Sequence, residues 1–187
     1  MRSISGRTGV TISFVSMNQT STLPAVSVVV LNWNGRGTVC DTIVSVLNLA
    51  PPTPDLIVVD NASTDGSDVE IKRRFPQVTL IRNPVNLGFA AGNNAGIVCA
   101  LESGADCVLL LNNDAQLEPS AVNHMVSALY ADSYRGAVVP KIYFSQRREE
   151  RRIWAAGARW RAFPPRVTMH GYNERDQGQY DTPGPVE

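Results

Sequence analysis

Short apolar runs alternate along this chain with segments in which apolar residues recur at helical spacing. The runs predict buried strands, at residues 26–31, 56–59, 78–82, 107–111 and 137–139, with 142–144 either extending or following the last of them. The intervening segments predict helices, at residues 38–49, 67–74, 88–101 and 119–130. Such an alternation is typical of an α/β fold with a mostly parallel sheet and helices on both faces.

The periodic pattern is confined to the middle of the chain and sets the expected boundaries. Residues 1–22 have few apolar anchors and predict a disordered N-terminal tail. Residues 23–145 carry the predicted core, whereas residues 146–187 are polar and aperiodic. We expect this last stretch to be an incomplete segment.

Composition narrows the classes of function. The chain has 187 residues with 17 Lys and Arg against 17 Asp and Glu, so its net charge is 0 and a generally basic nucleic-acid-binding protein is excluded. Its three cysteines share no C-x-x-C spacing, which argues against a metal or redox motif. No apolar run approaches the roughly 20 residues that cross a bilayer. We therefore predict a cytoplasmic protein, with peripheral contact at the inner membrane as an open alternative.

Three polar clusters directly follow predicted strands: Asn32–Gly35, Asp60–Gly66 and Asn112–Asp114. The carboxyl ends of parallel strands meet at one edge of a sheet, where ligands bind in folds of this class. Each cluster also has a purely structural interpretation, as a turn or a helix cap. Trp33 could either stack on a flat base or cover the core. Asp114 is a candidate ligand for a hard divalent cation.

Two common motifs fail on inspection. Residues Gly35-Arg36-Gly37 begin like a dinucleotide-binding fingerprint, but Cys40 stands where the third glycine is required. A calcium loop that starts at Asn61 would need a bidentate Glu at its twelfth position, which is Lys72. The sequence therefore favours neither a dehydrogenase nor an EF-hand protein.

Four segments, in this order, resemble the glycosyltransferases of family 2: Val26–Gly35 (VSVVVLNWNG), Leu56–Ser67 (LIVVDNASTDGS), Arg82–Gly96 (RNPVNLGFAAGNNAG) and Leu109–Pro119 (LLLNNDAQLEP). The similarity is greatest to the rhamnosyltransferase-like branch of that family. It covers residues 25–139 and continues more weakly over 153–157 and 171–180. The resemblance implies the Rossmann-like GT-A fold and a nucleotide-sugar donor.

The resemblance also implies a role for each matching position. Leu31 and Trp33 would lie against the nucleotide base, and Asp60 would accept a hydrogen bond from the imide N–H of uracil or thymine. Asp114, at the DXD position, would be the ligand of Mg²⁺ or Mn²⁺. Further contacts to the nucleotide sugar are implied at Asn86, Gly88, Asn93, Asn112 and Asn113.

The implied reaction is an inverting transfer of sugar from dTDP-rhamnose or a UDP-sugar to a glycan or lipid-linked acceptor, as in cell wall polysaccharide biosynthesis. In the family, the general base is an Asp in a downstream acidic cluster, and we expect it beyond Glu187. The alternative is a truncated, non-catalytic module that binds the nucleotide sugar. A nucleotidyltransferase ranks lower, because residues 32–36 lack the Gly-rich basic loop of that class.

Four arginines flank two glutamates over residues 147–152. Internal ion pairing on a solvated face is the ordinary interpretation of such a cluster. Contact with an anionic surface is the alternative, and it would suit a membrane-proximal acceptor.

Overall fold

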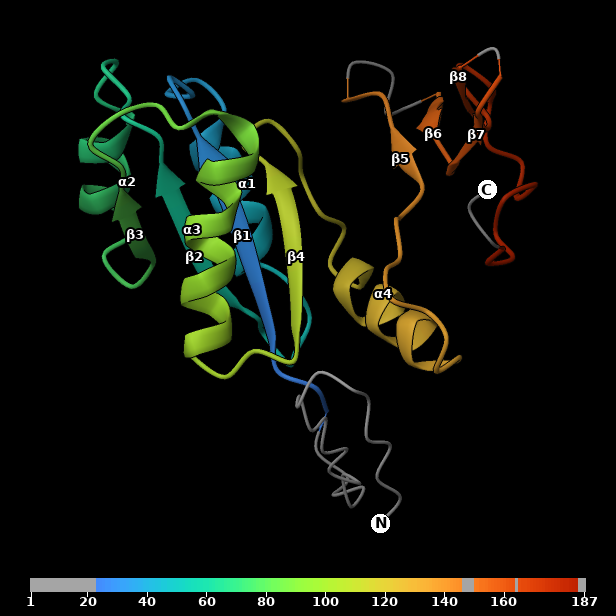
Figure 1. Ribbon diagram of the computed structural model, residues 1–187, viewed down its shortest axis with the longest axis horizontal. Coiled ribbons are helices and arrows are strands. Elements are labelled where there is room, and N and C mark those ends of the chain that lie inside the picture. The colour runs from blue at the N-terminus through green and yellow to red at the C-terminus, as the bar shows by residue number, and fades with distance from the viewer. Residues whose placement is uncertain (1–22, 146–149, 164, 185–187) are drawn as a thin grey trace, which may run out of the picture.

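The computed structural model describes residues 23–145, 150–163 and 165–184 (Figure 1). The predicted disordered tail, residues 1–22, lies outside these ranges and stays a prediction. The predicted boundary between a core and an incomplete C-terminal segment also stays a prediction.

A four-stranded parallel sheet forms the centre of the molecule. Its strands are β1 (Val26–Asn32), β2 (Asp55–Asp60), β3 (Thr79–Arg82) and β4 (Cys107–Asn112), in the order β3-β2-β1-β4. All four occur where apolar runs predict them. Their parallel pairing brings every carboxyl end to the same edge of the sheet.

Four helices alternate with these strands, as the periodicity predicts. They are α1 (Val39–Leu47), α2 (Ser67–Arg74), α3 (Gly88–Glu102) and α4 (Ala121–Tyr130). None of the helices in the described ranges is both long and apolar enough to cross a bilayer.

The two faces of the sheet belong to two separate hydrophobic clusters, because successive side chains of a strand point to opposite sides. Val28 and Val30 of β1 lie in one cluster with residues of α1 and α2. Val29 lies in the other cluster, with Ala100 of α3. A Cβ atom at Gly96 would overlap the Val29 side chain, so glycine here lets α3 approach the sheet closely. Helices therefore cover both faces, as predicted.

The helix α4 joins the core through the segment that precedes it. The N–H of Ala50 donates to the carbonyl of Pro119 at 2.8 Å, and the N–H of Leu117 donates to Ser45 Oγ at 3.2 Å. Val122, in the first turn of α4, is only 5% exposed and belongs to the cluster around α1. These contacts hold the chain that follows β4 against the α1 side.

The predicted strand at residues 137–139 is wrong. These residues form no strand, and Val139 is 61% exposed. Pro140 follows directly and has no N–H to donate to a neighbouring strand. The strand instead is β5 (Ile142–Tyr143), at the position that the sequence leaves open, and it pairs with β6 (Ile153–Ala155) in an antiparallel arrangement.

A second antiparallel pair, β7 (Ala158–Arg161) and β8 (Arg166–Met169), was not predicted. Asp176 ties this C-terminal region to β5. Its carboxylate accepts hydrogen bonds from Lys141 Nζ at 3.0 Å and from the hydroxyl of Tyr143. The Tyr143 hydrogen bond lowers the pKa of Asp176 well below its usual range, against the opposing effect of burial.

Candidate functional site

The ends of three strands converge at the carboxyl edge of the sheet. Asn32 is paired in register with Asp60 of β2, and the adjacent Leu31 is paired with Asn112 of β4. The strand order reverses at β1, because β2 lies on one side of β1 and β4 lies on the other. In open α/β sheets, such a reversal of strand order is where a ligand crevice forms.

Asn32 is the centre of a buried polar network at this edge. Its side chain is 0% exposed. Its Nδ2 atom lies within donating distance of Asp60 Oδ1 at 3.2 Å, Ser63 Oγ at 3.3 Å and Ser67 Oγ at 2.9 Å. Its Oδ1 atom accepts a hydrogen bond from Asn113 Nδ2 at 3.0 Å. One amide thus joins the ends of β1, β2 and β4.

Asp60 lies below the surface of the site. It is 0% exposed, and its Oδ2 atom accepts a hydrogen bond from the Ser63 N–H at 3.1 Å. Arg82 Nε lies 3.8 Å from the same oxygen, and Arg82 Nη1 forms an ion pair with Asp68 at 2.8 Å. The contact between Asp60 and a nucleotide base stays a prediction.

The loop after β1 is bound to the loop after β2, and this leaves Trp33 at the surface. The N–H of Asn34 donates to Ser63 Oγ at 2.9 Å, and the N–H of Thr64 donates to Asn34 Oδ1 at 2.9 Å. Trp33 is 56% exposed. A Cβ atom at Gly35 would overlap Asn113 Nδ2 and Asn32 Oδ1, so a larger residue would push the loop after β1 away from Asn113 and disturb the Asn32–Asn113 hydrogen bond.

Arg36 and Asp65 reinforce the same junction. The N–H of Arg36 donates to Asp65 Oδ2 at 2.9 Å, and Arg36 Nε pairs with Glu70 at 3.3 Å. Burial would raise the pKa of Asp65, but hydrogen bonds from Ser67 and from the Arg36 N–H outweigh it, so the pKa is lowered. These contacts hold the loops after β1 and β2 against each other.

Asn61 organises the segment that leads into α3, a role that the sequence analysis missed. Its Oδ1 atom accepts hydrogen bonds from Asn83 Nδ2 and from the N–H of Leu87, each at 3.0 Å. Its Nδ2 atom donates to Asn86 Oδ1 at 2.8 Å and to the carbonyl of Gly88 at 3.2 Å. Asn86 and Gly88, both predicted donor contacts, are thus brought to the site edge and lie exposed there.

Two further predicted residues lie where α3 meets β1. Leu31 is half-buried, and a Cβ atom at Gly92 would come within 2.6 Å of its Cδ1 atom. Asn93 is 4% exposed and donates from Nδ2 to the carbonyl of Phe89 at 2.9 Å within the helix. The structure brings both residues to the site, with the Asn93 amide hydrogen-bonded to its own helix.

The last residue of β4 and the two residues after it carry two exposed side chains and one that points inward. Asn112 and Asp114 are exposed, whereas Asn113 is half-buried and points to Asn32. A carboxylate and an amide oxygen suit Mg²⁺ or Mn²⁺, which prefer oxygen ligands and retain several waters. No group of three or more His, Cys, Asp or Glu residues in the described ranges could hold a metal. This donor set therefore fits a cation that takes its other ligands from phosphates and water.

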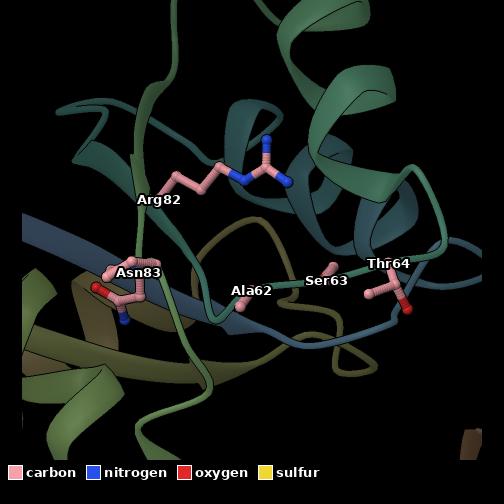
Figure 2. Close-up of a pocket in the computed structure, with 6 residues that line it drawn as sticks. Ala62, Ser63, Thr64, Arg82 and Asn83 are labelled. Atoms are coloured by element: carbon pink, nitrogen blue, oxygen red, sulfur yellow. The ribbon is translucent and has the colours of Figure 1, made fainter.

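An open cleft of about 470 Å³ lies beside this network, between the ends of β2 and β3 (Figure 2). Figure 2 shows the Arg82 side chain extending from β3 in the direction of α2, where Asp68 receives it. Arg82 is a site residue that the sequence analysis did not single out. Its position at the end of a strand, beside the polar loop after Asp60, was the available signal. The cleft is lined by Ala62, Ser63, Thr64, Arg82, Asn83 and Pro84.

Comparison with known proteins gives a family match over most of the chain. The family model described as Glycosyl transferase family 2 matches residues 27–182. Polypeptide N-acetylgalactosaminyltransferase 16 of Mus musculus is 29% identical over 123 residues, which are 64% of this chain and 22% of that protein. N-acetylglucosaminyl-diphospho-decaprenol L-rhamnosyltransferase of Mycobacterium tuberculosis (strain ATCC 25618 / H37Rv) is 30% identical over 105 residues, 51% of this chain and 34% of that protein. The chain spans 22% and 34% of the lengths of these two relatives.

Solved structures are similar in fold. The mannosyltransferase PcManGT from Pyrobaculum calidifontis, in complex with GDP-Man and Mn²⁺, has a TM-score of 0.55 at 24% identity, covering 60% of this chain and 34% of that one. S. aureus TarS 1-349 in complex with UDP has a TM-score of 0.50 at 18% identity, covering 65% of this chain and 39% of that one. The predicted α/β, Rossmann-like fold class is confirmed.

Proposed function

This chain belongs to glycosyltransferase family 2, and we propose that it binds the nucleoside diphosphate of a sugar donor at the carboxyl edge of its sheet. The buried network around Asn32 is the observation that carries this proposal. It fixes the loops after β1, β2 and β4 relative to one another and leaves Trp33 and Asp114 exposed. A flat apolar ring and a free carboxylate on one prearranged edge suit a base and a metal-bound diphosphate.

The base of the donor is proposed to lie between Trp33 and the cleft beside Arg82. An exposed indole offers a stacking surface. Arg82 lines the cleft, and its side chain is 60% exposed while it pairs with Asp60 and Asp68. Uracil and thymine carry two carbonyl oxygens that a guanidinium recognises. A UDP-sugar or dTDP-rhamnose is therefore the proposed donor.

The diphosphate is proposed to lie next to the segment after β4. Asp114 and Asn112 would hold Mg²⁺ or Mn²⁺ there, and the bound cation would neutralise the departing diphosphate. Asn86 and Gly88, held at the site by Asn61, would border the sugar. Asn93 and Asn113 support this edge through the bonds already described.

The proposed reaction is an inverting transfer to a hydroxyl group of a glycan or a lipid-linked acceptor, at a membrane surface in the second case. Direct displacement requires a general base that removes the acceptor proton. We propose that this base lies beyond Glu187, as the family pattern implies. Donor binding without transfer is the second candidate function.

Calorimetric titration with UDP, dTDP and GDP, each with Mn²⁺ or with a chelator, tests the donor site. We expect UDP or dTDP to bind more tightly with Mn²⁺, and Asp114→Ala to remove that metal-dependent gain. Asp132→Ala, which removes an exposed carboxylate far from the strand ends in sequence, is the matched control. Absence of binding for all three nucleotides would refute the proposal. Release of the nucleoside diphosphate from a donor in the presence of acceptor would indicate sugar transfer, and its absence would indicate donor binding alone.

A further inference from the structure

The pair β7–β8 has two chemically opposite faces. In register, Trp160 faces Val167 and Ala158 faces Met169, whereas Arg161 faces Arg166. Because side chains alternate across a strand, the first two pairs share one side and the arginines share the other. Figure 1 shows these strands at the side of the molecule away from the central sheet.

The apolar side and the turn are open to solvent. Trp160 is 62% exposed, Val167 is 61% exposed, and Phe163, beside the turn, is 90% exposed. Exposed apolar patches beside charged residues are typical of surfaces that contact a membrane or another protein.

On the charged side, Arg161 and Arg166 lack counter-ions in the part of the chain that the structure describes. No Asp or Glu occurs from Arg151 to Asn173. Neither Arg161 nor Arg166 has a hydrogen-bond or ion-pair partner in the described ranges, although they face each other directly across the pair. Like charges in directly opposite positions destabilise a strand pair. An anionic partner would relieve that repulsion.

Arg151 and Arg152, in contrast, both form ion pairs. Arg151 pairs with Asp176 at 3.1 Å, and Arg152 pairs with Glu150 at 2.9 Å. The Arg152–Glu150 pair is internal to the 147–152 cluster, as predicted, whereas Arg151 pairs outside it; residues 146–149 lie outside the described ranges. Arg161 of β7 and Arg166 of β8 therefore differ from their neighbours Arg151 and Arg152 in having no ion pair in the described ranges.

We propose that β7–β8 docks end-on on an anionic lipid bilayer, with the end at which Arg161 faces Arg166 toward the lipid. Trp160 and Phe163 would then lie at the headgroup boundary on one side, and the two arginines would lie against the phosphates on the other. Aromatic side chains favour the boundary between headgroups and acyl chains. Arginine can keep its guanidinium among the phosphates while its methylene groups lie deeper. This interaction does not depend on donor binding, but it would bring the proposed site close to a lipid-linked acceptor.

Vesicle sedimentation tests the proposal directly. The protein is mixed with vesicles of equimolar phosphatidylglycerol and phosphatidylcholine, or of phosphatidylcholine alone. We expect strong binding only to the anionic vesicles, weakened by salt because exposed charges are screened. A basic residue near an anionic surface contributes about a fivefold gain in partitioning. Arg161→Gln/Arg166→Gln should therefore reduce binding roughly 25-fold.

A matched control removes the same two charges elsewhere. Lys72→Gln/Arg73→Gln changes two exposed cations of α2 and should bind like the wild type. Trp160→Ser/Phe163→Ser should weaken binding while retaining the salt dependence, and circular dichroism verifies that each variant folds. Equal losses in the control and in Arg161→Gln/Arg166→Gln would overturn the proposal, as would equal binding to both kinds of vesicle. Self-association abolished by the β7–β8 variants in the absence of lipid would overturn it in favour of a second copy of the chain.

Discussion

Replacing Asn32 with Asp tests the buried network at the centre of the site. The substitution keeps the shape of the side chain but replaces the donating NH₂ group with a carboxylate oxygen. Asn32 Nδ2 lies 3.2 Å from Asp60 Oδ1, so Asn32→Asp would place two carboxylates at hydrogen-bond distance. At an effective dielectric constant of about 20, two like charges at that separation repel by roughly 5 kcal/mol.

The protein can avoid this repulsion by binding a proton, and that makes the cost dependent on pH. The pKa of the introduced carboxyl would be raised in the folded state above the unfolded value of about 3.9. The destabilisation relative to wild type is then small below pH 4 and grows as the pH rises toward the folded-state pKa. For each pH unit above the unfolded pKa, retaining the proton costs the folded state about 1.4 kcal/mol relative to the unfolded state. We therefore expect a loss of about 1.5 kcal/mol at pH 5 and about 4 kcal/mol at pH 7.

Urea denaturation followed by circular dichroism measures this difference. The free energy of unfolding is determined for wild type and Asn32→Asp at both pH values. Asn94→Asp, an isosteric change on the exposed side of α3, should remain within about 0.5 kcal/mol of wild type at each pH. A loss for Asn32→Asp that is the same at pH 5 and pH 7 would refute the reasoning, because it would mean that the Asn32 amide does not face Asp60.

The other predictions concern the segment after β4, the cleft and the C-terminal region. Asn113→Asp should weaken Mn²⁺-dependent UDP binding about tenfold, because it replaces the donor to Asn32 with an acceptor; tighter binding in the same titration would identify residue 113 as a metal ligand instead. Arg82→Gln should weaken the binding of uridine and of UDP by the same factor, about 5–20-fold, and a loss confined to UDP would place the guanidinium on the phosphates. Asp176→Asn should destabilise the chain at pH 7 by about 1–3 kcal/mol. Since the folded pKa of Asp176 lies below the unfolded value, this difference should shrink progressively as the pH falls from about 4 toward the folded pKa, which denaturation curves can follow.

The sequence was sufficient for the central sheet because its strands are unbroken apolar runs. Both faces of β1 are covered, so Val28, Val29 and Val30 are all buried and form such a run. The alternation of strands with helices then requires parallel pairing, which brings the polar clusters to one edge. This geometry explains why the convergence of Asn32, Asp60 and the residues after β4 was predictable without coordinates.

The C-terminal region was less predictable because its strands are only two to four residues long. The β7 sequence alternates arginine with apolar residues, which is a strand pattern, but it is only four residues long. The run at residues 137–139 is apolar yet forms no strand, since Pro140 follows it. The short apolar run was therefore predicted as a strand that does not form, whereas the short alternating run forms a strand that was not predicted.

Hydrogen-bonding roles at the site were the least predictable feature. Asn61 holds the segment before α3 only because β2 and β3 place it next to Asn83 and Asn86. The orientation of Asn113 toward Asn32 likewise depends on the register between β1 and β4. A short polar side chain in a loop has many possible partners, and tertiary contacts select among them.

The central claim is that a nucleoside diphosphate and a divalent cation meet at the ends of β1, β2 and β4. Amide NMR spectra of the chain, recorded with UDP and then with added Mn²⁺, test it most directly because Mn²⁺ broadens the signals of nearby nuclei. We predict broadening at residues 112–116 and at the loops over 32–36 and 60–66, only when UDP is present and only weakly in Asp114→Ala. Broadening centred elsewhere in the chain, or unchanged spectra at saturating UDP and Mn²⁺, would contradict the account.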